Sequence, residues 1–300
     1  MKWPLVLWRF GRPHTIIGSF ISVLAIYVIT VHMLGVGWGG WVVPLAAIAG
    51  ALACNVYITG LNQITDVEVD RINKPGLPVA AGDLSIKQAK AIVLVCGLLA
   101  LGISLWRSFY VMTVIATIMA IGTAYSLPPL KFKRHHFGAA MAISVVRGLL
   151  VNLGLHGHFV NELAGTITIH PQIIPLTVFV TGFSLGIAWF KDIPDTHGDA
   201  VHAFGTLAVL QGRRIAFTLG ATVVGVSYLW VIMAAILGLL PSATFFIVAH
   251  GVVLAIFLWF AGRLDVNDNA QVKRFYKFFW ALFSLEYVLY PLGFTLAAWT

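Results

Sequence analysis

Side chains with oxygen donors gather in two stretches of this sequence, and their spacing suggests metal chemistry. They are Asn62, Asp66 and Asp70 in the first acidic set, and Asp192, Asp195 and Asp199 in the second acidic set. Within each set, neighbouring members are three or four positions apart in the sequence, so a continued helix would carry their side chains along one face. Mg²⁺ binds oxygen ligands of this kind, uses few carboxylates and keeps waters or phosphate oxygens. The sequence therefore predicts two facing magnesium sites.

Two facing magnesium sites can hold a diphosphate between them. The ions would neutralise a diphosphate leaving group as its bond to carbon breaks, and would fix it in place. Basic side chains near the two sets would neutralise the remaining phosphate charge. They are Arg71, Lys74, Lys131 and Lys191. A calcium-binding loop is disfavoured because the ligand spacing of an EF-hand is missing.

The elements that must position these residues are membrane helices. Hydrophobic residues make up 59% of the 300-residue chain and charged residues only 10%, far less charge than a soluble domain carries. A run of about 20 apolar residues crosses a bilayer core as a helix, which satisfies its own backbone. Nine runs qualify, at 14–35, 41–62, 88–106, 109–127, 138–156, 172–190, 213–237, 242–262 and 276–298. We expect one all-α polytopic membrane domain over residues 1–300.

The placement of charge orients this bundle. The formal net charge is +8, and all basic residues except Arg107 and Arg147 fall on one side of the nine-span arrangement. This asymmetry is the positive-inside pattern, which predicts a cytoplasmic N-terminus and a C-terminus on the opposite side. The basic charge is then topological, which argues against nucleic-acid binding. Both acidic sets begin at the cytoplasmic end of a span, so the motifs and the topology agree.

The two acidic sets also carry a family resemblance. N-x-x-x-D-x-x-x-D together with K-D-x-x-D-x-x-G-D is similar to the motifs of the UbiA superfamily of intramembrane aromatic prenyltransferases. Further stretches resemble one branch, the homogentisate phytyltransferases of tocopherol biosynthesis, of cyanobacterial type. They lie at 8–18, 55–83, 122–134, 146–155, 191–199 and 275–294. Ala200 departs from the pattern because the family usually has a basic residue there, and His197 stands where acidic residues are common. Either change could alter diphosphate affinity or donor choice.

The resemblance implies a fold, a site and a reaction. The fold is nine transmembrane helices around a central cavity, with motif-bearing cap loops on the cytoplasmic side. The first acidic set would serve one Mg²⁺ and the second acidic set the other, and all six residues would be catalytic. The reaction is Mg²⁺-dependent transfer of a long isoprenoid, phytyl for this branch, from its diphosphate to homogentisate with decarboxylation, giving a methyl-prenyl-benzoquinol. The partners would be these two substrates and the lipid of a bacterial inner or thylakoid membrane.

Three residues within or at the ends of the spans are candidates to face the substrates of such an enzyme. An ionisable residue such as Arg147 is costly within a span and usually faces a cavity or a partner. Arg147 would bind the acceptor carboxylate or the diphosphate, or else pair with Glu286 or with helix carbonyls, and the sequence is compatible with both uses. Asn152 would orient the acceptor by hydrogen bonds or link helices. Tyr125 is expected in the wall that shields the allylic cation from water.

Other functions are compatible with parts of this pattern. Ion-coupled transporters also place acids in cavities, but here the acids lie at helix ends on one side, apart from Glu286. A purely structural membrane protein would not need magnesium ligands. Within the enzyme class, the alternative acceptors are 4-hydroxybenzoate, a naphthoate or a chlorophyllide. The donor is open between phytyl, geranylgeranyl and solanesyl diphosphates, because an apolar tunnel distinguishes one methylene by only about 1–3 kcal/mol.

Overall fold

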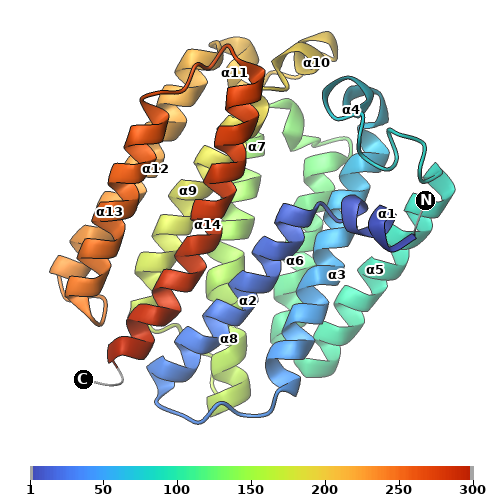
Figure 1. The fold of residues 1–300 in the computed structure, drawn as a ribbon. Helices are drawn as coiled ribbons and strands as arrows, with labels where there is room; N and C mark the ends of the chain where they lie inside the picture. The colour runs from blue at the N-terminus through green and yellow to red at the C-terminus, as the bar shows by residue number, and fades with distance from the viewer. Residues whose placement is uncertain (1–2, 298–300) are drawn as a thin grey trace.

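The structure is a computed structural model that describes residues 3–297, and helices make up its regular structure (Figure 1). Nine helical stretches in this range are long and apolar enough to span a membrane. They are Pro13–Leu34 (α2), Val42–Thr65 (α3), Ile86–Arg107 (α5), Phe109–Ser126 (α6), His136–Ala164 (α7, η2 and α8), Pro171–Asp192 (η3 and α9), Arg213–Ile236 (α12), Ala243–Ala261 (α13) and Asn269–Ala297 (α14). The nine predicted spans are confirmed, and the chain is an integral multi-pass membrane protein. The predicted end of the ninth span at 298 lies outside the described residues.

Local sequence signals set where some of these helices begin. Ser85 starts α5 with a capping box, since its hydroxyl accepts from Gln88 N at 3.2 Å while Gln88 Oε1 accepts from Ser85 N at 2.9 Å. Ser108 caps α6 by accepting from Val111 N at 3.2 Å. Because Ser108 alone separates α5 from α6, the two helices turn back and pack against each other.

Each acidic set lies at a break between two helices. α3 ends at Thr65, and α4 (Val67–Asn73) follows on the other side of Asp66. α9 ends at Asp192, and α10 (Thr196–Val201) follows a short turn. The expectation that one helix continues through each set is therefore wrong. The carboxylates instead lie where the chain leaves its span and bends, at the mouth of the bundle.

Both breaks lie at the same end of the bundle, which we call the acidic end. Figure 1 shows α4 and α10 there, while α14 finishes at the other end. Asp70 N bonds Asp66 O at 2.7 Å and Asp199 N bonds Asp195 O at 3.1 Å, so each acidic set keeps one helical turn. The other short helices are α1 (Trp3–Phe10), η1 (Phe132–Arg134) and α11 (Leu207–Leu210).

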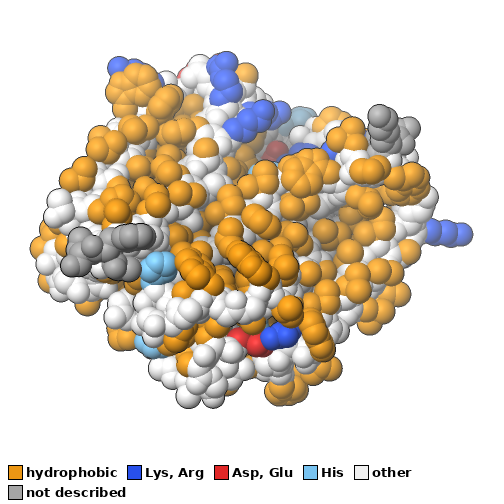
Figure 2. All heavy atoms as spheres, turned by 60° about the horizontal axis from the view of Figure 1, so that its bottom comes forward, with side chains coloured by type: hydrophobic (Ala, Val, Ile, Leu, Met, Phe, Trp, Pro, Cys, Tyr) orange, Lys and Arg blue, Asp and Glu red, His pale blue; other side chains and the backbone are white. Residues whose placement is uncertain are grey.

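The apolar core is uneven across the bundle. Its largest cluster joins α2, α9, α12, α13 and α14, where the Phe183 and Phe279 rings stack at 4.1 Å. Two smaller clusters join α3 to α1, α5 and α6. Hydrophobic side chains also cover the outside of the bundle, with most Lys and Arg toward one edge of the view (Figure 2). The helices between these clusters enclose a cavity.

Candidate active site

One cavity of about 630 Å³ opens at the acidic end and extends into the bundle. Its lining comes from α1, α2, α3, α4, α6, η1, α7, η2, α8, α9, α10 and α14, so almost every part of the fold contributes. All six residues predicted as metal ligands line it. Lys74, Lys191, Tyr125 and Arg147, predicted to contact substrate, line it as well. The topology thus brings together residues more than a hundred positions apart in the chain.

Hydrogen bonds and an ion pair order the first acidic set. Arg12 Nη2 donates to Asn62 Oδ1 at 3.0 Å, and Asn62 Nδ2 donates to Asp66 Oδ2 at 2.9 Å. Lys133 Nζ lies 2.6 Å from Asp66 Oδ1, and the lysine side chain is 4% exposed. Asp70 Oδ2 is buried without a hydrogen-bond partner. The set therefore presents an unused carboxylate oxygen beside two cations.

The second acidic set is paired with lysines. Lys191 Nζ donates to Asp192 Oδ1 at 2.7 Å, between neighbouring residues of the chain. Lys74, which follows α4, forms an ion pair with Asp195. A lysine that can reach a carboxylate here can also reach the oxygens of an anion bound beside it. Positive charge therefore lines the same rim as the carboxylates.

The two acidic sets are joined directly across the mouth of the cavity. Asn73 Nδ2, at the end of α4, donates to Asp199 Oδ1 in α10 at 3.1 Å. The backbone at Gly198 packs so closely that a Cβ there would lie 2.2 Å from Asn73 Oδ1. Only glycine allows this approach. The contact fixes α4 against α10, and with the Lys74–Asp195 pair it holds the two sets face to face.

Burial shifts pKa values at the acidic end. Burial first, and then the charge of neighbouring carboxylates, raises the pKa of Asp70 to about 6 and that of Asp199 to about 7. Burial lowers the pKa of Lys133 to about 8, although the pairing with Asp66 opposes this shift. Burial thus disfavours the ionised form of both carboxyls. A cation bound beside them would favour that ionised form.

The donor set fits Mg²⁺ better than a metal that needs a closed shell of protein ligands. Within residues 3–297, no three His, Cys, Asp or Glu side chains stand close enough together to hold one ion. Mg²⁺ takes one or two carboxylates and completes its shell with waters and phosphate oxygens. The unpartnered Asp70 oxygen and the oxygen-only donors of both sets meet that requirement. One or two side chains of the set Asn62, Asp66 and Asp70 could hold one ion, and one or two of the set Asp192, Asp195 and Asp199 another, with waters and phosphate oxygens completing each shell.

Arg147 lies in a π-helical turn in the middle of the fifth span. The turn is η2 (Val145–Leu150), between α7 and α8, and such turns are frequent at functional sites because they displace side chains from the regular helix. Asn152 Nδ2 donates to Arg147 O at 3.0 Å and to Gly148 O at 2.7 Å. Gly148 itself packs on α9, where a Cβ would lie 2.1 Å from Thr181 Oγ1. The turn is thus locked in place.

The guanidinium of Arg147 rests on aromatic rings rather than on an acid. It lies 4.9 Å from the Trp280 ring centroid and 5.7 Å from that of Phe283, as in cation–π contacts. Glu286 instead lies with its Oε1 2.8 Å from His250 Nε2, so the suggested Arg147–Glu286 pair is wrong. Among the described residues, Arg147 has no ion pair. The cavity therefore holds an arginine that has no anionic partner among residues 3–297.

Three residues predicted to contact substrate lie elsewhere. Arg71 is exposed, pairs with Glu68 at 2.7 Å and is not part of the lining. Lys131 is not part of the lining, and its Nζ lies 5.9 Å from the Phe204 ring centroid. Asn152 is fully buried behind the lining, where it accepts from Tyr287 Oη at 3.0 Å. Its contacts position Arg147 instead.

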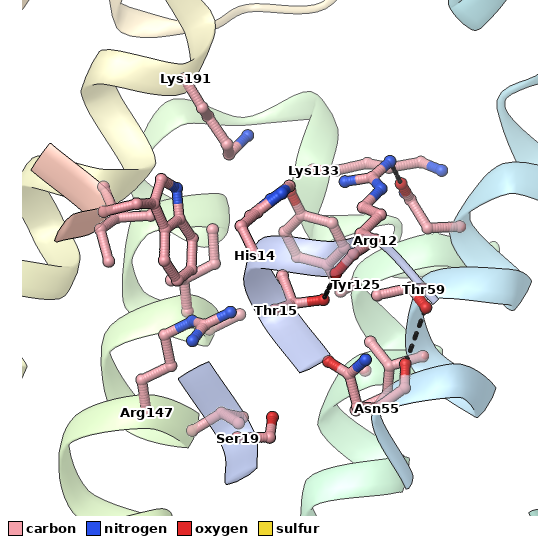
Figure 3. A pocket seen from close by; sticks show the side chains of 18 of the residues that line it. Arg12, His14, Thr15, Ser19, Asn55, Thr59, Tyr125, Lys133, Arg147 and Lys191 are labelled. Carbon is pink, nitrogen blue, oxygen red and sulfur yellow. Dashed lines mark hydrogen bonds between the residues drawn. The ribbon is translucent and has the colours of Figure 1, made fainter. Parts of the chain in front are cut away.

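Several residues of the lining were not predicted to be site residues, although they lie in stretches that resemble the family. They are Arg12, His14, Asn73, Lys133, Tyr276 and Trp280. Lys133 is one of three basic residues near the end of α6, and nothing in the spacing distinguishes it from Lys131. Arg12 and His14 precede and begin α2, far from either acidic set in the chain, and only the fold brings them to the cavity (Figure 3).

The chain is similar to known proteins along nearly its whole length. The UbiA prenyltransferase family matches residues 8–283. Homogentisate phytyltransferase of Synechocystis sp. is 41% identical over 297 residues, covering 95% of this chain and 94% of that protein. Homogentisate geranylgeranyltransferase of Triticum aestivum is 34% identical over 295 residues, covering 95% and 71%. The fold resembles that of a UbiA homologue from Archaeoglobus fulgidus bound to GPP and Mg²⁺, with a TM-score of 0.66 and 14% identity over 98% of this chain and 99% of that one.

Proposed function

The chain belongs to the UbiA prenyltransferase family, and we propose that it transfers an isoprenoid from its diphosphate to homogentisate. Phytyl is the proposed group, since the relative at 41% identity is a homogentisate phytyltransferase. Geranylgeranyl and solanesyl are the alternatives. The acceptor loses CO₂ from its carboxymethyl group, and the product is a methyl-prenyl-benzoquinol. The observation that carries the proposal is one cavity with two acidic sets and lysines at its mouth and an unpaired arginine farther inside.

The acidic end is proposed to bind the diphosphate. Mg²⁺ held by the first acidic set and by the second acidic set would neutralise the diphosphate as its bond to the allylic carbon breaks. Lys74, Lys133 and Lys191 already lie among the carboxylates and would donate to the remaining phosphate oxygens. Arg12 orients Asn62 and adds a fourth positive charge at the mouth. These groups are ordered before the reaction, which is how charged sites stabilise a leaving group most effectively.

The interior of the cavity is proposed to bind the acceptor and the isoprenoid. Arg147 binds the homogentisate carboxylate, because no acidic residue among residues 3–297 pairs with its guanidinium. Apolar side chains such as Ile115, Ile118 and Leu150 line the same space. They hold the isoprenoid and keep water from the allylic cation. Tyr125, beside them in the lining, adds an aromatic face.

The proposed membrane orientation follows from the basic residues. A cytoplasmic N-terminus places the acidic end in the cytoplasm or its thylakoid counterpart, where water-soluble Mg²⁺ and diphosphate enter. The C-terminus then lies on the opposite side. The proposed location is a bacterial inner membrane or a thylakoid membrane, with the cavity open to membrane-dissolved isoprenoid.

Mass spectrometry of the products tests this proposal. Purified protein in lipid is incubated with homogentisate, Mg²⁺ and phytyl, geranylgeranyl or solanesyl diphosphate. We expect a decarboxylated prenyl quinol that disappears with EDTA and in the Asp66→Ala and Asp195→Ala variants. The best donor identifies the natural chain. A wild-type protein that forms no product with any donor would contradict the homogentisate assignment.

A further inference from the structure

His14 is the one histidine that lines the cavity among residues 3–297. It follows Pro13 in the first turn of α2. Its ring packs edge-on against Trp280, with centroids 4.8 Å apart and an interplanar angle of 62°. Trp280 is also the ring that carries Arg147. One indole therefore fixes both an imidazole and a guanidinium at the wall of the cavity.

The ring nitrogens of His14 are available to a bound molecule. Neither nitrogen has a hydrogen-bond partner within the described part of the chain. Two other histidines in the spans differ, since His156 Nδ1 lies 2.9 Å from Thr30 Oγ1 and His250 Nε2 lies 2.8 Å from Glu286 Oε1. Those two imidazoles are held by the protein and are fully buried. His14 alone among these three faces the cavity.

His14 lies between the diphosphate end and the acceptor anchor. The charged groups near enough to act on it are Arg12, which precedes α2, Lys74 at the mouth and Arg147 across the cavity. Figure 3 shows the same order, with Lys191 on one side of His14 and Arg147 on the other. An acceptor held by its carboxylate at Arg147, with its reacting carbon turned toward the diphosphate, would present its ring to the imidazole.

The reaction needs a group that both takes and gives a proton. The carbon–oxygen bond of the donor breaks and its electron pair leaves with the diphosphate, while a ring carbon of the acceptor forms the new carbon–carbon bond. That ring carbon must then lose its proton to restore aromaticity. Loss of CO₂ leaves an electron pair on the benzylic carbon, which must gain a proton. The two proton transfers balance, so no further reactant is required.

We propose that His14 is the catalytic base that removes the proton from the attacked ring carbon, and that its imidazolium returns a proton to the benzylic carbon as CO₂ departs. This inference rests on the proposed function. Among the other bases of the cavity, Asp66, Asp192 and Asp195 pair with lysines, and Asp70, whose Oδ2 has no hydrogen-bond partner, belongs to the proposed metal site. Asp199 accepts from Asn73. An imidazole with free nitrogens beside the ring is the group whose chemistry suits both transfers.

The test compares His14→Gln and His14→Phe with the wild type, using homogentisate deuterated on its ring. His135→Gln serves as the control, because His135 is exposed and lies outside the lining. We expect kcat to fall by about 10²- to 10⁴-fold in both His14 variants, the usual contribution of acid–base catalysis. Thermal stabilisation by Mg²⁺ and an unreactive diphosphate analogue should be unchanged. The isotope effect on kcat should rise in the variants, because ring-proton removal becomes rate-limiting.

Each other outcome contradicts a distinct claim. If His14→Phe keeps its activity because a ring still packs on Trp280, or if kcat falls with no rise in the isotope effect, His14 is structural. A kcat within twofold of the wild type in His14→Gln would also overturn its role as base. If the wild type itself forms no prenylated product from homogentisate, the proposed function fails, and the role of His14 fails with it.

Discussion

Arg147 and Glu286 are two ionisable residues deep within the membrane spans, and the protein treats them in opposite ways. Arg147 faces the cavity, rests on Trp280 and has no ion pair among residues 3–297. Glu286 is 1% exposed and meets His250 at 2.8 Å between α13 and α14, outside the cavity lining. An ionisable group at this depth is costly unless it is paired. The chain supplies the partner of Glu286, whereas Arg147 faces the cavity without an ion pair among the described residues.

The surroundings of the two residues reinforce this contrast. His250 lies among the rings of Phe246, Tyr228 and Tyr290 in a fully buried aromatic cluster. None of these residues lines the cavity. Arg147 lies on a π-helical turn beside an open space. An intramembrane charge therefore indicates a binding site only when the fold leaves it unpaired and accessible.

The largest expected effect is at the mouth of the cavity. Asp66→Asn and Asp195→Asn should each lower kcat by at least about 10³-fold, the scale of losing preorganised charge stabilisation. If the two acidic sets hold one diphosphate, the double variant should lose little more than either single variant. Asp265→Asn, an exposed carboxylate in the last connection, should retain wild-type turnover. Losses that multiply in the double variant would show that the two sets act independently.

A smaller effect is expected from the lysines of the rim. Lys74→Met removes a charge-assisted hydrogen bond to phosphate and should raise the KM for the diphosphate donor about 10- to 100-fold. Turnover of homogentisate at saturating donor should change less. Lys87→Met, exposed at the start of α5, is the matched control. Steady-state kinetics with varied donor check this expectation, and an unchanged donor KM would remove Lys74 from the site.

The paired region should affect stability without affecting chemistry. His250→Phe leaves Glu286 buried without its partner and should lower the free energy of unfolding by about 3 kcal/mol. Glu286→Gln keeps a hydrogen bond to His250 and should cost less. The double variant His250→Phe/Glu286→Leu should recover part of the loss. Thermal unfolding in detergent measures the effect. A loss of turnover per folded molecule in these variants would give the pair a functional role instead.

The smallest effect expected is a pH dependence of stability in chelated protein. The pKa values of Asp70 and Asp199 are raised to about 6 and about 7 from 3.8. At pH values between the unfolded pKa and the raised pKa, the folded state holds protons that the unfolded state has lost, so the free energy of unfolding falls as pH rises. The stabilisation from the protonated Asp70 and Asp199 is fully present below the unfolded pKa and is lost as pH passes through about 6 to 7. With EDTA present, the melting temperature should decline over this range, and Asp199→Asn should decline less. A melting temperature that rises with pH would contradict the raised pKa values.

Much of this account could be predicted from the sequence, because the two strongest signals are local. Apolar runs predict each span, and the spacing of Asp66, Asp70 and their counterparts indicates the metal chemistry. Helix continuity through Asp66 could not be predicted, since the break depends on how α4 packs against α10. The pairing of Glu286 with His250 could not be predicted either, because His250 lies on another helix. His14 and Lys133 enter the site only through the tertiary fold, which no spacing in the chain reveals.

The most direct test of the central claim compares two acceptors that differ in the carboxylate. Initial rates are measured for homogentisate and for methylhydroquinone, which lacks that group, in the wild type and in Arg147→Gln. If Arg147 receives the carboxylate, the wild type should favour homogentisate in kcat/KM by about 10- to 100-fold, the value of a charge-assisted hydrogen bond. In Arg147→Gln the ratio should approach one while methylhydroquinone is still prenylated. An equal preference in both proteins would contradict the claim that the unpaired arginine selects the acceptor.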